Sequence, residues 1–151
     1  MYLSGAGPIN GTGNDSANYI YGNGNANTIA GLLGNDQLGG GKGDDTIDAG
    51  PGIDIIYEEG GNDTLTGGGA KDYFHFGPAF GLDTITDFTL SEDDHIEVPM
   101  SLFATPSAVL SAAAQVGADT VIMAPSGDRI TLRNVNVTDL TVDYFSVNNS
   151  F

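Results

Sequence analysis

An acidic residue or its amide returns every nine residues, seven times in succession, through the first half of this 151-residue chain. The seven positions are Asn18, Asn27, Asp36, Asp45, Asp54, Asp63 and Asp72. An apolar side chain follows two residues after each of them, at Ile20, Ile29, Leu38, Ile47, Ile56, Leu65 and Phe74. A flexible linker would not keep the two residue types in phase over so many units. The period therefore predicts a regularly stacked coil.

The residue types within one unit indicate its local structure. Glycine adopts positive φ without steric cost, so the first six residues can turn tightly with carbonyl groups pointing inward. The last three residues form a short strand whose central side chain points to the core, because side chains alternate along a strand. Residues 40–48 match the pattern G-G-x-G-x-D-x-U-x at every defined position. We predict an all-β fold: a parallel β-roll (a β-helix or solenoid) of nonapeptide repeats over residues 10–76.

The stacking predicts two ladders of acidic residues. Nine residues close half of a coil, so units 18 residues apart lie on the same edge. One ladder contains Asn18, Asp36, Asp54 and Asp72, and the other contains Asn27, Asp45 and Asp63. Hard cations such as Ca²⁺ bind six to eight oxygen ligands, so the gaps between rungs could hold up to about five ions. Gaps with an asparagine lose one charge and should be weaker or empty. A metal-free asparagine ladder is the alternative for these first turns.

These units resemble the RTX, or hemolysin-type calcium-binding repeat, family of secreted bacterial proteins, closely over residues 10–76. The resemblance implies that the aspartates bind Ca²⁺ together with carbonyl groups of the turns. Carried over, the carbonyl ligands include Gly31, Leu33, Gly34, Gly40, Gly41, Lys42, Gly43, Ala49, Gly50, Pro51, Gly52, Glu58, Gly60, Gly61, Gly67 and Gly69. Ala49, Glu58 and Glu59 replace turn glycines, which weakens these sites without excluding them, since a carbonyl ligand needs no particular side chain.

The nine-residue period stops after Phe76. Residues 82–98, with DTITDF and then EDDHIEV, are similar to the segment that closes the coil in RTX modules. Asp83 or Asp87 is a candidate ligand of a last metal site. The alternative is that both lie on the solvated face of a strand, which the alternation over residues 83–88 predicts.

Residues 77–151 are predicted to form a β-rich cap that contains one short helix and covers the open end of the coil. Thr105 would cap the helix, Pro106 would begin it, an apolar face would extend to Val116, and Gly117 would end it. Strands are expected over residues 120–123, 129–132 and 143–147. The last segment also resembles a type I secretion signal, an acid followed by apolar residues; a final edge strand is the alternative.

Charge and composition exclude several partners. The net charge is −16 with only four Lys and Arg residues, so the chain lacks the basic face that nucleic acids or anionic membranes need. No run is long enough to insert into a membrane, and the first residues lack a signal-peptide pattern. The absence of cysteine suits a chain exported unfolded and then stabilised by calcium. The resemblance implies export by the type I secretion machinery with an uncleaved C-terminal signal.

We find no catalytic motif and expect no enzyme. His75 and His95 do not lie in H-E-x-x-H, and neither a thiol nor G-x-S-x-G is present. We expect a secreted, extracellular, monomeric and non-catalytic calcium-binding module. It would fold on extracellular Ca²⁺ and aid the secretion, folding and stability of an attached or partner domain, catalytic or adhesive. The alternative is an extracellular polysaccharide-binding module, of the alginate type, or an adhesin.

Overall fold

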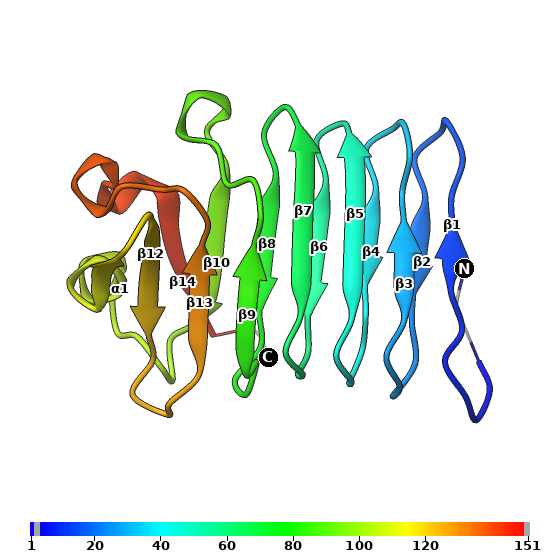
Figure 1. Cartoon of the computed structure of the whole chain (residues 1–151), viewed down its shortest axis with the longest axis horizontal. Coiled ribbons are helices and arrows are strands. Elements are labelled where there is room, and N and C mark those ends of the chain that lie inside the picture. The colour runs from blue at the N-terminus through cyan, green and yellow to red at the C-terminus, as the bar shows by residue number, and fades with distance from the viewer. Residues whose placement is uncertain (2–3, 150–151) are drawn as a thin grey trace.

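Two β-sheets face each other along the molecule in the computed structural model, which describes residue 1 and residues 4–149 (Figure 1). The eight-stranded sheet has the order β1 (Gly11–Thr12), β3 (Thr28–Ala30), β5 (Thr46–Pro51), β7 (Thr64–Gly69), β9 (Leu82–Ile85), β13 (Arg129–Leu132), β12 (Asp119–Met123) and β11 (Ala113–Val116). The six-stranded sheet has the order β14 (Phe145–Asn148), β10 (His95–Pro99), β8 (Tyr73–Phe76), β6 (Ile55–Glu58), β4 (Gln37–Gly39) and β2 (Tyr19–Tyr21). Consecutive repeats alternate between the sheets, which confirms the predicted parallel β-roll.

The apolar residue of each repeat stacks on its equivalent two repeats along the chain. Ile29 is in register with Ile47, and Ile47 with Leu65, in one sheet. The other sheet has the corresponding column of Ile20, Leu38, Ile56 and Phe74. All seven side chains are buried. The core of the roll therefore consists of two facing columns that the nine-residue period sets in place.

The cap continues both sheets beyond the repeats. Strand β10 pairs in parallel with β8 and β14, and β9 pairs in parallel with β7 and β13. Strands β11 and β12 then add an antiparallel pair at the end of the larger sheet. Paired strands thus continue from the repeats into the cap in both sheets. The predicted division into residues 10–76 and 77–151 stays a prediction. Residues 150 and 151 of the predicted cap lie outside the described residues.

Among its described residues, the cap contains one short helix, as predicted, α1 (Pro106–Ser111), and three short 3₁₀ segments. Thr105 Oγ1 accepts a hydrogen bond from the Ala108 amide at 3.2 Å, as expected of an N-cap. The predicted extension to Val116 is wrong. Residues 113–116 form β11 because they pair with β12, and Gly117, at φ 65°, lies in the turn between these strands.

Two predicted strands have different boundaries. Strand β9 ends at Ile85, not at Phe88, because Phe88 turns into the core and Asp87 binds backbone amides of β7. The predicted strand over residues 143–147 begins as a 3₁₀ segment, Val142–Tyr144, and becomes β14 only at Phe145.

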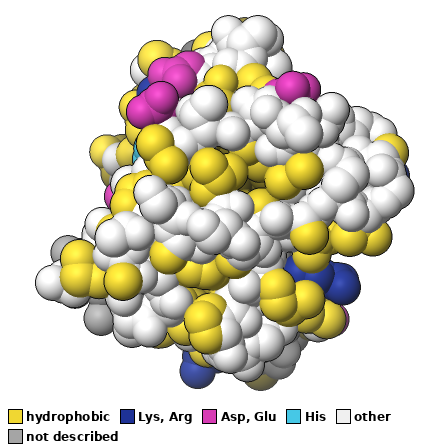
Figure 2. All heavy atoms as spheres, turned by 90° about the vertical axis from the view of Figure 1, so that its left-hand side faces the viewer, with side chains coloured by type: hydrophobic (Ala, Val, Ile, Leu, Met, Phe, Trp, Pro, Cys, Tyr) yellow, Lys and Arg dark blue, Asp and Glu magenta, His cyan; other side chains and the backbone are white. Residues whose placement is uncertain are grey.

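The end of the molecule that the cap forms carries hydrophobic side chains among mostly uncharged ones (Figure 2). An open hollow of about 710 Å³ lies in the cap, lined by residues that include Leu102, Phe103 and Met123. Among the described residues, no helix has the length and apolar character needed to cross a membrane.

Candidate metal centre

The ladder carboxylates are held in place by the backbone of the neighbouring rung. The amide of Asp36 donates to Asp54 Oδ1 at 2.7 Å, and the amide of Asp54 donates to Asp72 Oδ1 at 2.9 Å. On the other edge, the amide of Asp45 donates to Asp63 Oδ1 at 2.6 Å. The backbone amides of Asn18 and Asn27 donate in the same way to Oδ1 of Asp36 and of Asp45. The structure thus brings together the seven residues of the two predicted ladders.

Each ladder has one further rung beyond the repeats. The amide of Asp63 donates to Asp83 Oδ1 at 2.8 Å, and the amide of Asp72 donates to Asp94 Oδ1 at 2.9 Å. Of the two candidates for a last ligand, Asp83 thus takes the ladder position, while Asp87 accepts hydrogen bonds from the amides of Gly67 and Gly68. Sequence reasoning missed Asp94, because it follows Asp72 by 22 residues and so falls outside the period.

The second carboxylate oxygen distinguishes the rungs that could bind a metal. The Oδ2 atoms of five aspartates are buried and have no hydrogen-bond partner: Asp36, Asp45, Asp54, Asp72 and Asp83. Burying an ionised oxygen without a partner is costly, so such atoms call for a cation or a proton. Asp94 differs, because its Oδ2 accepts a hydrogen bond from the Thr89 amide. Asp94 therefore forms the last rung of its ladder by accepting hydrogen bonds from two backbone amides.

Turn carbonyl groups converge on the same carboxylates. A Cβ atom at Gly31 would overlap both Asp36 Oδ2 and the carbonyl oxygen of Ala49 in the next turn. A Cβ at Gly22 would likewise overlap the side chain of Asn27 and the carbonyl oxygen of Gly40. The glycines thus leave a space in which a carboxylate and a carbonyl of the next turn come close together. Carboxylate and carbonyl oxygens are the ligands that Ca²⁺ prefers, so these residues fit that ion.

The structure gives contacts for most of the other carbonyl groups that were predicted as ligands. Some of their carbonyl oxygens lie where a Cβ atom would stand on a glycine of a neighbouring turn, namely those of Gly31, Gly34, Gly43, Gly50 and Gly61. Some accept backbone hydrogen bonds, namely those of Pro51, Glu58, Gly60, Gly61 and Gly69. A carbonyl oxygen has two lone pairs, so one hydrogen bond leaves room for a metal. Metal ligation by all of these carbonyl groups stays a prediction, as it does for Leu33, Gly41, Lys42, Gly52 and Gly67.

Burial changes the acidity of the ladder. Burial raises the pKa of Asp45 and Asp54 to about 6. Hydrogen bonds from the backbone amides of Asn27 and Asp36 lower the pKa, but their effect is smaller. Burial and neighbouring carboxylates raise the pKa of Asp72 and Asp83 further, to about 8. Without a cation, Asp72 and Asp83 therefore retain protons near neutral pH.

The asparagine rungs are satisfied within the chain. Asn18 Nδ2 donates to Asp36 Oδ1 at 3.2 Å and to the Asn14 carbonyl at 3.0 Å. Asn27 Oδ1 accepts from the Asn23 amide at 2.8 Å. An amide supplies its own donors and carries no charge, so these first turns need a cation less than the aspartate rungs do.

Buried aspartates stacked between the glycine turns of a parallel β-roll define a calcium-binding repeat domain. The family model described as RTX calcium-binding nonapeptide repeat (4 copies) matches residues 11–38, 21–56 and 48–78. The repeat segment of this chain belongs to that family, whose repeats bind Ca²⁺ and are typical of secreted bacterial proteins. No curated protein is similar enough in sequence to match the chain.

Solved structures are similar to this chain at low sequence identity, and the first of those named here shares its fold. The AlgE6R2 subunit of the Azotobacter vinelandii mannuronan C5-epimerase has a TM-score of 0.64 and 21% identity, covering 83% of this chain and 90% of that one. The AlgE6R3 subunit of the same enzyme has a TM-score of 0.34 and 23% identity, covering 89% and 80%. The extracellular lipase LipA of Serratia marcescens has a TM-score of 0.40 and 16% identity, covering 94% of this chain and 40% of the lipase.

Proposed function

We propose that this chain is a non-catalytic module of a secreted protein that folds when it binds extracellular Ca²⁺. The observation that carries the proposal is the row of buried Oδ2 atoms without hydrogen-bond partners along both ladders. Without metal, these carboxylates must either repel one another or hold protons. A cation that binds only the folded form stabilises it by mass action, so calcium and folding are coupled.

This coupling would serve export. The chain would stay unfolded where Ca²⁺ is scarce, pass through the type I secretion machinery, and fold outside the cell. Once folded, it would aid the folding and stability of an attached catalytic or adhesive domain. The acidic net charge of −16 supports the proposal, because up to about five Ca²⁺ ions would reduce it to about −6.

Circular dichroism during a Ca²⁺ titration of the chelated chain tests the proposal, with Mg²⁺ as the control. We expect a cooperative transition from coil to β-structure with Ca²⁺ and none with Mg²⁺, which keeps part of its hydration shell and demands a stricter geometry. A chain that is fully folded in chelator would contradict the proposal, because the apolar core and the cap would then suffice.

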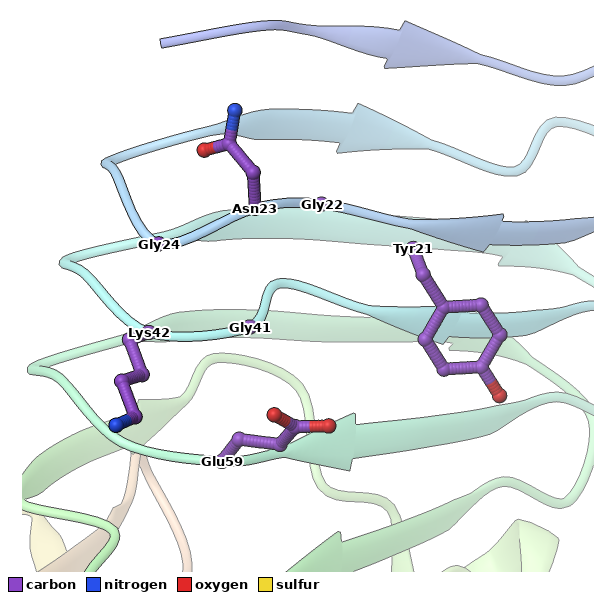
Figure 3. Close-up of a pocket in the computed structure, with 7 residues that line it drawn as sticks. All are labelled: Tyr21, Gly22, Asn23, Gly24, Gly41, Lys42 and Glu59. Carbon is purple, nitrogen blue, oxygen red and sulfur yellow. The ribbon is translucent and has the colours of Figure 1, made fainter. Parts of the chain in front are cut away.

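The second candidate function is binding of an extracellular polysaccharide, and a surface groove favours it. A pocket of about 350 Å³ is lined by Tyr21, Asn23, Lys42 and Glu59 together with the turn glycines (Figure 3). The ring centroids of Tyr21 and Tyr57 lie 6.1 Å apart on the adjoining sheet, and Tyr57 lies 5.2 Å from His75. An aromatic row beside a lysine could contact sugar rings and a uronate group.

The fold that the chain shares with an epimerase subunit points to mannuronan as the first polysaccharide to test. Isothermal titration with mannuronan oligomers in Ca²⁺ should give heat with the unchanged chain and little heat with Tyr21→Ala. No heat from any acidic glycan would remove this candidate. The calcium proposal would be unaffected, because its transition is measured without glycan.

A further inference from the structure

Glu58 occupies a position at which the other turns have a small residue. The equivalent residues are Gly13, Gly22, Gly31, Gly40, Ala49 and Gly67. A Cβ atom at Gly31 or Gly40 would overlap Oδ2 of the aspartate five residues later. The side chain at this position is therefore directed at the ladder carboxylate of its own turn. For Glu58, that carboxylate belongs to Asp63.

The stacking changes next to Glu58 in a way that admits a long side chain. Regular stacking places a carbonyl of the next turn against this position, as Ala49 does at Gly31. Beyond Glu58, however, the next rung on this edge follows Asp63 by 20 residues instead of 18. The longer loop over residues 77–81 takes the place of a regular turn, and the Glu58 side chain lies inside with 3% of its surface exposed.

Glu58 meets two other carboxylates there. One oxygen of each of Glu58, Asp63 and Asp83 lies within 4.8 Å of the others, and all three residues are buried. Both oxygens of Glu58 and Oδ2 of Asp83 have no hydrogen-bond partner. Within the described part of the chain, neither of the recorded ion pairs involves any of the three. Three clustered acids, two of which have unpaired oxygens, need a cation or protons to offset their charge.

We propose that the carboxylates of Glu58, Asp63 and Asp83 bind one Ca²⁺ ion together, with Glu58 as a side-chain ligand that the regular turns lack. This inference rests on the proposed calcium-dependent function and adds a distinct site to it. Three carboxylates give this site one negative charge more than a gap between two aspartates. Since affinity for Ca²⁺ increases with the charge of the ligands, this is the tightest site of the chain.

The position of the site gives the ion a structural role. Asp63 directly precedes β7, whereas Asp83 lies in β9, which pairs with the cap strand β13. An ion between them links the last turn of the repeats to the first strand of the cap in the larger sheet. Loss of this ion would therefore weaken the junction between repeats and cap more than loss of an ion between two regular turns.

Calcium titration calorimetry in competition with a chelator, on the full chain, tests the site with the variant Glu58→Gln. We expect the unchanged chain to bind one ion at least about tenfold more tightly than the others, and Glu58→Gln to lose at least that factor for this ion alone. The matched control is Glu59→Gln, which removes an exposed acid from the neighbouring residue and should leave all affinities unchanged. The Ca²⁺-induced rise in Tm should be smaller for Glu58→Gln than for the control.

A second variant, Glu58→Gly, restores the residue that most other turns have. It shows whether an effect of Glu58→Gln comes from loss of the carboxylate or from local disruption by the glutamine side chain. Loss of the tightest ion in both variants supports the proposal. Wild-type calcium affinities in Glu58→Gly, or in a folded Glu58→Gln, would overturn the role of Glu58 while leaving the calcium-dependent function intact. An unchanged chain that binds no Ca²⁺ at all would overturn both.

Discussion

The backbone amide of Asp36 donates a hydrogen bond to Oδ1 of Asp54, 18 residues away, at 2.7 Å. This contact orients the Asp54 carboxylate so that its Oδ2 atom stays buried without a partner. One oxygen thus serves the stacking of turns, and the other is left for a cation. The same division of roles recurs at Asp45 and Asp72, so a carboxylate with one bonded and one unpartnered oxygen is a feature of the repeat itself.

Removing Asp54 should affect more calcium than removing Asp45. Asp54 stands between two aspartates, Asp36 and Asp72, whereas Asp45 stands between Asn27 and Asp63. Asp54→Ala therefore damages two sites with a carboxylate on either side, and Asp45→Ala damages one. Calorimetry should show a larger loss in the number of bound ions for Asp54→Ala. Equal losses would contradict the assignment of ions to the gaps between rungs.

The metal-free fold should lose stability as pH rises. The pKa of Asp45 and Asp54 is about 6 and that of Asp72 and Asp83 about 8 in the folded chain, against an ordinary value near 4. The folded form therefore binds more protons than the unfolded form between these values, so the free energy of unfolding decreases from about pH 4 to about pH 8.

Circular dichroism of the metal-free chain between about pH 8 and about pH 5 measures this dependence, with more β-structure expected at the lower pH. Saturating Ca²⁺ should remove or reverse it, because the ion competes with protons for the same oxygens. A metal-free chain that is more stable at the higher pH would contradict the burial of these carboxyl groups.

Close stacking of the turns should make Gly68 intolerant of a side chain. Gly68 has φ 104°, and a Cβ there would overlap the backbone of Gly50. We expect Gly68→Ala to lower the free energy of unfolding in Ca²⁺ by about 2–4 kcal/mol, from backbone strain and overpacking together. Gly24→Ala is the matched control, because a Cβ at Gly24 would meet nothing within 4 Å. Comparable losses in both variants would show that glycine flexibility, rather than turn contact, explains the effect.

The period predicted most of the roll and its ladders, because the acid and the apolar residue of each unit keep one phase. It could not predict where the ladders end. Asp83 and Asp94 take their places only after insertions that lengthen the stacking interval to 20 and 22 residues. The period also could not predict that the Glu58 side chain points inward. Most other turns have glycine at this position, so the sequence gives no sign of the direction that a side chain takes there. The helix was predicted too long because pairing with β12 outweighs helical periodicity over residues 113–116.

Asp94 should stabilise the fold without binding an ion. Its two oxygens accept hydrogen bonds from the amides of Asp72 and Thr89, at 2.9 and 2.7 Å. Asp94→Asn replaces one acceptor with a donor that faces a backbone N–H, which should cost about 2 kcal/mol in saturating Ca²⁺. The control is Asp93→Asn, which alters an exposed pair with Lys71 and should change stability little. Urea unfolding gives the stability, and calorimetry should find the same number of bound ions as in the unchanged chain. A reduced number in Asp94→Asn would instead make Asp94 a ligand and extend the metal sites to the last rung of the ladder.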